Sequence, residues 1–309
     1  MIKVQDVAYV RFGAPDLDVM ERFLTDFGLS TALRTADRLY MRGFGPQPFV
    51  HVTERIEEPK VLGFGLLAQS LSDLEQLATA HDTAVQDNVE PGGGYHVRLV
   101  DPQGLQVDVI WGHAPAPPPA SSLRAPLQLN NSGELRRLGG TQRPGDGSSH
   151  VMRLGHVVLK VPSLEPSLQF YSENFGLRVA DGYFAGTPEN RIAAFLRCDL
   201  GSEYTDHHTV ALIAGGTGFE HCAFEVLDWD DLMAGHHYLH ARGHKHSWGI
   251  GRHIQGSQVF DYWRDPFGNK IEHWTDGDLI NEQYAGGYAP IGPNALAQWA
   301  PEMGPDFML

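Results

Sequence analysis

The segment QVFDYWRDPFGNKIEHWTD, residues 258–276, has the pattern of a β-hairpin. Residues 259–263 and 270–274 are rich in β-branched and aromatic side chains, and the DPFG sequence at 265–268 is typical of a turn. The second strand carries one acidic residue, Glu272. A carboxylate on the inner face of a sheet is unfavourable unless it is paired or binds a metal ion. The hairpin alone favours an exposed Glu272 at the rim of a sheet, so its role depends on the rest of the chain.

The composition bounds the class of protein. The chain has 309 residues, 42% of them hydrophobic and 20% charged, which is enough for two globular domains. A formal net charge of −15 argues against a nucleic-acid or anionic-membrane partner. Two cysteines, Cys198 and Cys222, make no disulfide framework, and no apolar stretch approaches the roughly 18–20 residues that span a bilayer. We therefore expect a cytoplasmic protein without a membrane segment.

The same order of elements recurs along the chain. Residues 7–12 have the pattern of a strand and 16–27 that of a helix with Asp16 as N-cap. The sequence PDLDVMERFLTDFGL at 15–29 matches PSLEPSLQFYSENFGL at 162–177, and the DPQG turn at 101–104 matches DPFG. The chain thus reads as a duplication, which predicts an α+β fold of two domains, each a pair of βαβββ modules.

Composition also suggests the domain boundaries. Residues 1–113 form the first module pair and residues 151–276 the second. Between them, 114–150 is rich in Pro, Gly and Ser and reads as a linker. Residues 277–309 form a C-terminal tail rich in Pro, Gly and aromatics, in which Trp299, Phe307 and Leu309 suggest docking over the second domain as a lid.

Two histidines occupy equivalent places in the second half. His156 and His221 each stand at the start of the first strand of a module, followed by an apolar run. Each alone would be interpreted as a structural histidine. Together with Glu272 on the closing strand, they make the two-histidine, one-carboxylate set that leaves open positions on a ferrous ion. The corresponding residues of the first half are about Tyr9, Gly63 and Asp108, which cannot make that site.

Further polar residues are expected near this set. His208, in the sequence DHHTVALI, is expected on a strand that leads into the one carrying His221. His253 precedes the hairpin and Tyr262 lies on its first strand. A histidine that titrates near neutral pH can take and return a proton, and the neighbouring His207 could play the same part.

Taken together, these motifs resemble the type I extradiol catechol dioxygenases of the vicinal oxygen chelate superfamily. LGHVVLKV, HHTVAL, FEHCAFEV, GRH and FDYWRDPFGNKIEHW follow that family's order at compatible spacings. The resemblance implies a curved, funnel-like mixed sheet in each domain and homo-oligomeric assembly. It implies cleavage of an aromatic diol by O₂ beside the hydroxyl groups, with Fe(II), or alternatively Mn(II), as the cofactor.

The resemblance also assigns residues. It makes His156, His221 and Glu272 the metal ligands, His208 the acid–base residue, and His253 and Tyr262 the residues that hydrogen-bond the substrate and oxygen. Phe195 and Val158 are expected to line the pocket for the ring. Residues 199–207 look longer than in the family members that cleave biphenyl diols, which leaves the choice of diol open.

Two other classes of function remain. One is another metalloenzyme of the superfamily, such as a glyoxalase or an epoxide-opening resistance enzyme, and the other is a metal-free protein that sequesters a ligand. The set of His208, His253 and Tyr262 favours the dioxygenase over the first class, and the intact set of His156, His221 and Glu272 argues against the second.

A separate group of histidines recurs every four residues, at His236, His240 and His244. That spacing could hold zinc on one face of a helix. However, Gly243 interrupts the helix and no carboxylate or cysteine stands nearby in the sequence, so a solvated helix face is the preferred interpretation.

Overall fold

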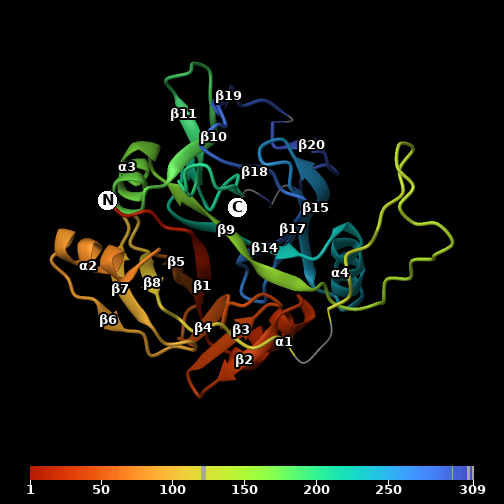
Figure 1. Ribbon diagram of the computed structural model, residues 1–309, viewed down its shortest axis with the longest axis horizontal. Helices are drawn as coiled ribbons and strands as arrows, with labels where there is room; N and C mark the ends of the chain where they lie inside the picture. Colours follow the sequence, from red (N-terminus) through yellow and green to blue (C-terminus); the bar gives the residue numbers. More distant parts are fainter. Residues whose placement is uncertain (120–122, 294, 305–306, 308–309) are drawn as a thin grey trace.

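The computed structural model describes residues 1–119, 123–293, 295–304 and 307. Two large mixed sheets dominate it, with few helices (Figure 1). The first half consists of β1 (Asp6–Ala14), α1 (Leu17–Asp26), β2 (Ser30–Arg34), β3 (Arg38–Arg42), β4 (His51–Arg55), β5 (Lys60–Leu67), α2 (Leu71–Ala80), β6 (Gln86–Asp87), β7 (Tyr95–Val100) and β8 (Gln106–Trp111).

The second half repeats this order and adds short strands. Its elements are β9 (Val151–Val161), α3 (Leu164–Phe175), β10 (Arg178–Phe184), β11 (Arg191–Arg197), β12 (Thr205–Asp206), β13 (Val210–Ala214), β14 (Gly218–Val226), α4 (Trp229–Ala241), β15 (Lys245–His253), β16 (Val259–Arg264), β17 (Lys270–Thr275), β18 (Leu279–Ile280), β19 (Tyr288–Pro290) and β20 (Ala297–Trp299).

The strand orders of the two sheets correspond. The first is β2-β3-β4-β1-β5-β8-β7-β6, and the second, between its two edge strands, is β10-β11-β13-β9-β14-β17-β16-β15. In each sheet an antiparallel pair, β1 with β5 or β9 with β14, joins two modules at the centre. The predicted α+β fold of paired βαβββ modules is confirmed.

Local sequence explains how the modules begin and end. The Asp16 side chain accepts hydrogen bonds from the backbone N–H groups of Asp18 and Val19, which starts α1 as predicted. Helix α3 ends at Gly176, whose φ of 69° is a conformation that glycine adopts without strain. The two matched turns are built alike, because Asp101 accepts from the N–H groups of Gln103 and Leu105 and Asp265 accepts from those of Phe267 and Asn269.

One apolar core runs through both halves. Phe12 of β1 contacts Phe219 of β14 with ring centroids 5.4 Å apart, and Phe27 at the end of α1 stacks on His273 of β17. The His273 Nε2–H group also donates to the Phe27 carbonyl at 2.7 Å. A core shared by both halves does not show where one domain ends and the next begins. The domain boundaries expected from composition therefore stay a prediction.

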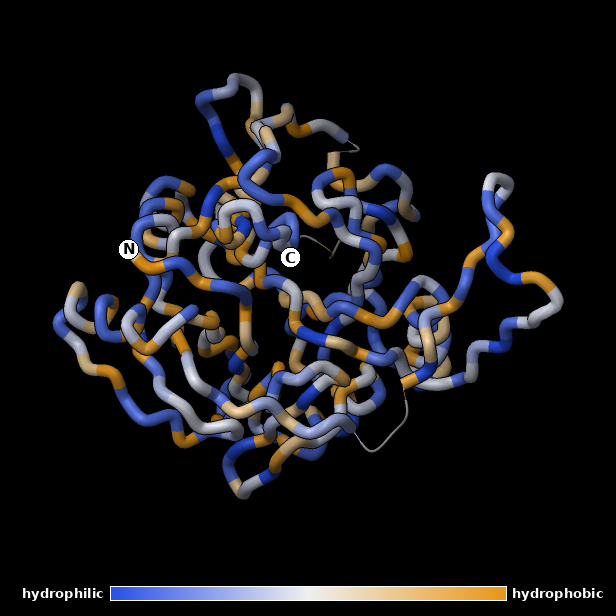
Figure 2. The backbone as a smooth tube through the Cα atoms, viewed as in Figure 1, coloured by the Kyte–Doolittle hydropathy of each residue, from blue (hydrophilic) through white to orange (hydrophobic). Residues whose placement is uncertain are grey.

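The segment between the halves runs outside this core, beyond α4 (Figure 1), and is largely hydrophilic along its course (Figure 2). It is attached to the N-terminal end of α4 at two points, Arg124 and His150. Arg124 donates two hydrogen bonds of 2.7 Å to Asp228, and the backbone N–H of His150 donates to Asp231. Ser149 packs against Gly235, where any side chain would collide with it.

The C-terminal segment adds strands at both edges of the second sheet. β19 pairs with β10 and β20 pairs with β15, while β18 pairs with β12. Phe307 is buried against Trp248, Phe260 and Tyr262, as its expected docking requires. Trp299 remains 43% exposed, with its ring centroid 5.7 Å from that of Trp229, and Leu309 lies outside the described residues.

Candidate metal centre

Three neighbouring strands bring the predicted metal-binding residues together. His156 lies on β9, His221 on β14 and Glu272 on β17, and Ala223 of β14 pairs with both His156 and Glu272. The Glu272 Oε2 atom lies 3.5 Å from Nε2 of His156 and 3.2 Å from Nε2 of His221. One ligand atom from each residue lies within 4.8 Å of the others, which is compatible with a single ion.

The burial of Glu272 supports this interpretation. Its side chain is fully buried, and neither of its oxygens has a hydrogen-bond partner in the part of the chain that the structure describes. Burial by itself raises the pKa of Glu272, but the His156 and His221 imidazoles overcome this and hold it well below its usual range. A buried carboxylate without hydrogen bonds is costly unless a cation compensates it, so these residues fit a divalent metal ion.

A second group of charges lies behind His221. Its Nδ1 atom is hydrogen-bonded to Glu220, and the buried Lys270 donates from Nζ to Glu220 and, at 2.6 Å, to the Phe307 carbonyl. Burial raises the pKa of Glu220, but His221 and Lys270 lower it to about 2. A carboxylate on Nδ1 fixes the tautomer of a histidine, which turns Nε2 toward the ion. Sequence reasoning missed Glu220 and Lys270.

His208 lies beside the candidate ligands, but in a loop and not on the strand that the sequence predicted. It occupies the short loop between β12 and β13, 4% exposed, with its ring centroid 4.1 Å from that of His156. Its Nδ1 atom lies 3.1 Å from Nδ1 of His207, whose Nε2 atom lies 2.8 Å from Asp181. Asp181 also accepts from Tyr284 and from the backbone N–H of Gly287. His207 therefore connects His208 to a carboxylate.

His253 and Tyr262 meet on the other side of the ligands. The His253 Nδ1 atom is hydrogen-bonded to the Leu296 carbonyl at 2.8 Å, and its Nε2 atom lies 2.9 Å from the Tyr262 hydroxyl. The carbonyl can only accept, so Nδ1 carries the proton and a neutral His253 accepts from Tyr262 through Nε2. The Tyr262 ring lies 5.1 Å from His221, and burial raises the pKa of Tyr262 well above its usual value.

The two expected pocket residues lie close to the site. The half-buried Phe195 has its ring centroid 5.1 Å from that of His208. Val158 stands two residues after His156 on β9 and pairs with His221. Their proposed contact with a substrate stays a prediction.

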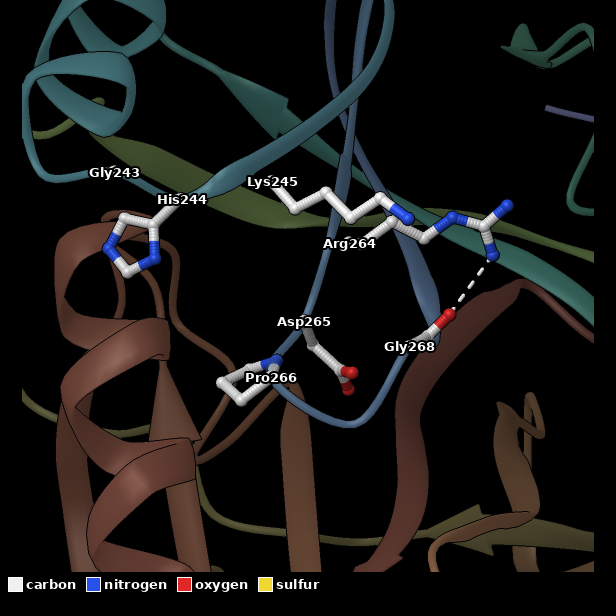
Figure 3. A pocket seen from close by; sticks show the side chains of 7 residues that line it. All are labelled: Gly243, His244, Lys245, Arg264, Asp265, Pro266 and Gly268. Atoms are coloured by element: carbon white, nitrogen blue, oxygen red, sulfur yellow. Dashed lines mark hydrogen bonds between the residues drawn. The ribbon is translucent and has the colours of Figure 1, made fainter. Parts of the chain in front are cut away.

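A surface cavity of about 550 Å³ lies elsewhere, at the turn between β16 and β17 (Figure 3). Lys245 and Arg264 lie side by side there, and Arg264 donates to the carbonyl of Gly268 at 3.0 Å. The other lining residues are Gly243, His244, Asp265 and Pro266. None of the candidate metal ligands contributes to it, so we do not assign it to the metal centre.

The register of the first sheet identifies the counterparts of the ligands. Gly65 pairs with both Tyr9 and Asp108, as Ala223 pairs with His156 and Glu272. The Tyr9 hydroxyl donates to Asp108 at 2.8 Å, and the counterpart of His221 is Gly63. These are the positions expected from the sequence, and they hold a tyrosine, a glycine and a carboxylate paired with arginine.

Comparison with known proteins agrees with the fold. Residues 153–273 match the model of the Glyoxalase/Bleomycin resistance protein/Dioxygenase superfamily. Metapyrocatechase 2 of Cupriavidus necator is 30% identical over 311 residues, covering 97% of this chain and 90% of that protein. The chain belongs to the type I extradiol dioxygenases of the vicinal oxygen chelate superfamily.

Solved structures share the fold over nearly the whole chain. The Mn(II)-bound glyoxalase from Novosphingobium aromaticivorans has a TM-score of 0.81 at 24% identity, covering 100% of this chain and 95% of its own. Homoprotocatechuate 2,3-dioxygenase from Arthrobacter globiformis has a TM-score of 0.78 at 18% identity, covering 99% and 91%. Among the described residues, no helix is long and apolar enough to cross a membrane.

Proposed function

We propose that this protein cleaves a catechol-type aromatic diol with O₂ beside the two hydroxyl groups, using Fe(II) held by His156, His221 and Glu272. The observation that carries the proposal is the fully buried Glu272, whose oxygens face two imidazoles and make no hydrogen bond among the described residues. Membership of the extradiol dioxygenases supports it. The product would be of the 2-hydroxymuconic-semialdehyde type.

The bound iron would supply an electron relay between the diol ring and O₂, which it can bind together because three protein ligands leave three positions open. The protein's part is to orient both reactants and to manage protons. Mn(II) accepts the same ligands, and elemental analysis of the active protein distinguishes the two ions.

His208 acts as the acid–base residue in this proposal. Burial, reinforced by the neighbouring imidazoles, lowers its pKa well below the usual value, so it is neutral before substrate arrives. If His207 donates from Nε2 to Asp181, its Nδ1 accepts from Nδ1–H of His208. That arrangement leaves Nε2 of His208 with a lone pair that can take a proton from the diol and return it.

Tyr262 and His253 form the opposite wall. Because burial raises its pKa, Tyr262 keeps its proton, which it donates to Nε2 of His253, and its hydroxyl oxygen can accept a hydrogen bond from the diol. His253 is fixed by the carbonyl of Leu296, so it holds the phenol in one orientation. Phe195 and Val158 would pack against the ring. The net charge of −15 favours a diol without strongly anionic substituents.

The decisive experiment is anaerobic reconstitution with Fe(II), followed by a panel of diols read by oxygen uptake and yellow product. The panel contains catechol, a biphenyl diol, homoprotocatechuate and a trihydroxytoluene. Oxygen uptake that requires both iron and a diol supports the proposal. Full iron loading without turnover of any aromatic diol would falsify it.

The same preparation separates the alternatives. Nickel or manganese without diol-dependent oxygen uptake indicates another metalloenzyme of the superfamily, and a protein that takes up no metal indicates a ligand-sequestering role. The fold resemblance to a glyoxalase makes a glyoxalase assay the natural companion measurement.

We also propose that the tail acts as a lid. The backbone carbonyls of Leu296 and Phe307 accept hydrogen bonds from His253 and Lys270. His253 contacts Tyr262, and Lys270 is linked to His221 through Glu220. Deletion from Gly292 onward should weaken diol binding and speed inactivation by oxygen. Unchanged values for both would show that the tail is only structural.

Cellular location and assembly belong to the same proposal. Both cysteines are buried and unpaired, which fits a reducing cytoplasm. Homo-oligomeric assembly follows the family expectation. Fractionation of cells that produce the protein tests the location, and sedimentation of the purified protein tests the assembly.

A further inference from the structure

A second histidine cluster lies on helix α4 and the strand that follows it. His236 and His240 are one turn apart on α4, and His246 is the second residue of β15. One ring nitrogen from each of the three lies within 4.8 Å of the others. Neighbouring ring centroids are 4.5–5.0 Å apart. The rings therefore converge on one point.

A buried carboxylate orients two of these rings. Asp261 of β16 has no exposed surface, and it lies 3.0 Å from Nδ1 of His236 and 2.8 Å from Nε2 of His246. It also accepts from Trp263 Nε1 at 2.7 Å. A neutral imidazole that donates through one nitrogen keeps a lone pair on the other, so Nε2 of His236 and Nδ1 of His246 can bind a cation. This is the arrangement by which carboxylates orient metal-binding histidines.

The chain reversal at the end of α4 changes the set expected from the sequence. Gly243, with φ of 77°, turns the chain back, so His246 on β15 joins His236 and His240. His244, the third residue in the sequence-based set, is instead hydrogen-bonded to Asp26 of α1 at 2.9 Å. The fold also supplies the carboxylate that the neighbouring sequence lacks, because Asp261 reaches the cluster from β16, later in the chain. The preference for a merely solvated helix face therefore has to be revised.

This cluster is separate from the first metal centre. Asp261 and Tyr262 are consecutive on β16, and successive residues of a strand point to opposite faces of its sheet. Tyr262 faces His221, whereas Asp261 faces the helix side, with His236 and His246. The two sites lie back to back across one strand.

We propose that His236, His240 and His246 bind a divalent transition-metal ion, with Zn(II) as the best match, and that Asp261 orients two of the ligands. Three imidazoles and a water molecule complete the tetrahedral coordination that zinc prefers. His240 is exposed and the other two are partly exposed, so an ion reaches the site from solvent. The ion would join α4 to β15 and β16, the strands that carry His253 and Tyr262.

The test compares zinc uptake by the full-length protein and two single variants. Each is saturated with its resident metal, dialysed against zinc, and analysed for all metals. The wild type should take up one additional zinc per chain without losing the resident metal, and His240→Ala should take up none. His237→Ala removes the next exposed histidine of the same helix, outside the cluster, and should behave like the wild type.

A thermal measurement provides the second readout. At a hundredfold excess over Kd, zinc should raise the Tm of the wild type and of His237→Ala by roughly 3–8 °C, and leave that of His240→Ala unchanged. The difference in Tm shift between His237→Ala and His240→Ala reports zinc binding at this cluster alone, whatever ion the first centre holds. Equal zinc uptake by wild type and His240→Ala, or uptake only as the resident metal is lost, would overturn the proposal.

Discussion

The strands beside the central pairs, β8 in the first sheet and β17 in the second, carry a carboxylate at the same point of the register, and the two carboxylates are compensated in different ways. In the second sheet, Glu272 faces two imidazoles and has no hydrogen-bond partner among the described residues. In the first sheet, its counterpart Asp108 accepts from Tyr9 and from Arg98, with Arg11 3.6 Å away. One carboxylate is neutralised within the protein, and the other is arranged for an added cation.

The difference extends to the backbone. The counterpart of His221 is Gly63, where a Cβ atom would lie 2.0 Å from the Gln106 carbonyl oxygen, so no side chain fits. Arg11, 3% exposed, also binds Glu54 and Glu90, which fills the space with charge pairs. The two halves therefore share their strands and turns, while only the second has the residue set proposed to bind a metal.

The largest effect is expected at the two carboxylates themselves. Glu272→Gln removes the charge that holds the ion, so iron content and ring cleavage should fall below detection. The matched change Asp108→Asn should lower stability but leave the iron content unchanged. Elemental analysis and oxygen uptake measure both variants, and an iron-loaded Glu272→Gln protein would contradict the comparison.

His208→Phe tests the acid–base residue by giving the second half the residue of the first. The register makes Phe49 the counterpart of His208, because His51 and Val210 pair with equivalent residues of β1 and β9. Turnover should slow by about 10²–10⁴, the usual contribution of a positioned acid or base, while iron is retained. Full turnover with normal iron content would assign the proton transfer to another group.

Lys270→Gln gives the second sheet the residue that the first sheet has at the same register position, which is Gln106. Its effect is expected to be smaller than that of His208→Phe. Without the lysine, Glu220 loses its cation and holds His221 less firmly. Loss of such a supporting contact typically lowers metal affinity about 10–100-fold. Competition with a chelator gives the affinity, and an unchanged value would mean that His221 needs no support.

The smallest effect concerns pH and lies in the first sheet, where His51 is the counterpart of Val210. Burial lowers the pKa of His51 to about 3, so below pH 6.5 the unfolded chain binds a proton that the folded chain does not. The free energy of unfolding therefore decreases as the pH falls from about 6.5 toward 3. The decrease due to His51 is about 2 kcal/mol at pH 5. His51→Val should remove this loss.

Urea unfolding of both metal-free proteins at several pH values checks the prediction. The difference in unfolding free energy between His51→Val and the wild type should shift in favour of the variant as the pH falls. A difference that stays constant across pH 5–7 would mean that His51 does not titrate during unfolding.

The sequence was sufficient to predict that His156, His221 and Glu272 come together, because the pattern that places them occurs in both halves of the chain. His156, His221 and Glu272 each stand out in an apolar strand, and the matching turns at Asp101 and Asp265 align the two halves of the sequence. The order of elements along the chain then follows from local periodicity and the internal repeat.

The remaining features depend on contacts between distant parts of the chain. β2 is exposed along nearly its whole length and β10 contains Asp181 and Gly182, so neither shows the alternation of a half-buried strand. His208 lies in a loop next to β12, which pairs with β18 of the tail. Glu220 and Lys270 could have been noticed as single charges in buried strands, but only the fold makes them partners.

The tail has a consequence for how copies of the chain can associate. An open edge of a sheet offers unpaired N–H and C=O groups to any other chain, which invites aggregation. Here β19 covers β10 at Gly182–Phe184, and β20 covers β15 at Arg252 and His253. The tail therefore protects these stretches of the second sheet from pairing with another copy, and a chain cut before β19 would uncover both and should aggregate, as light scattering would detect.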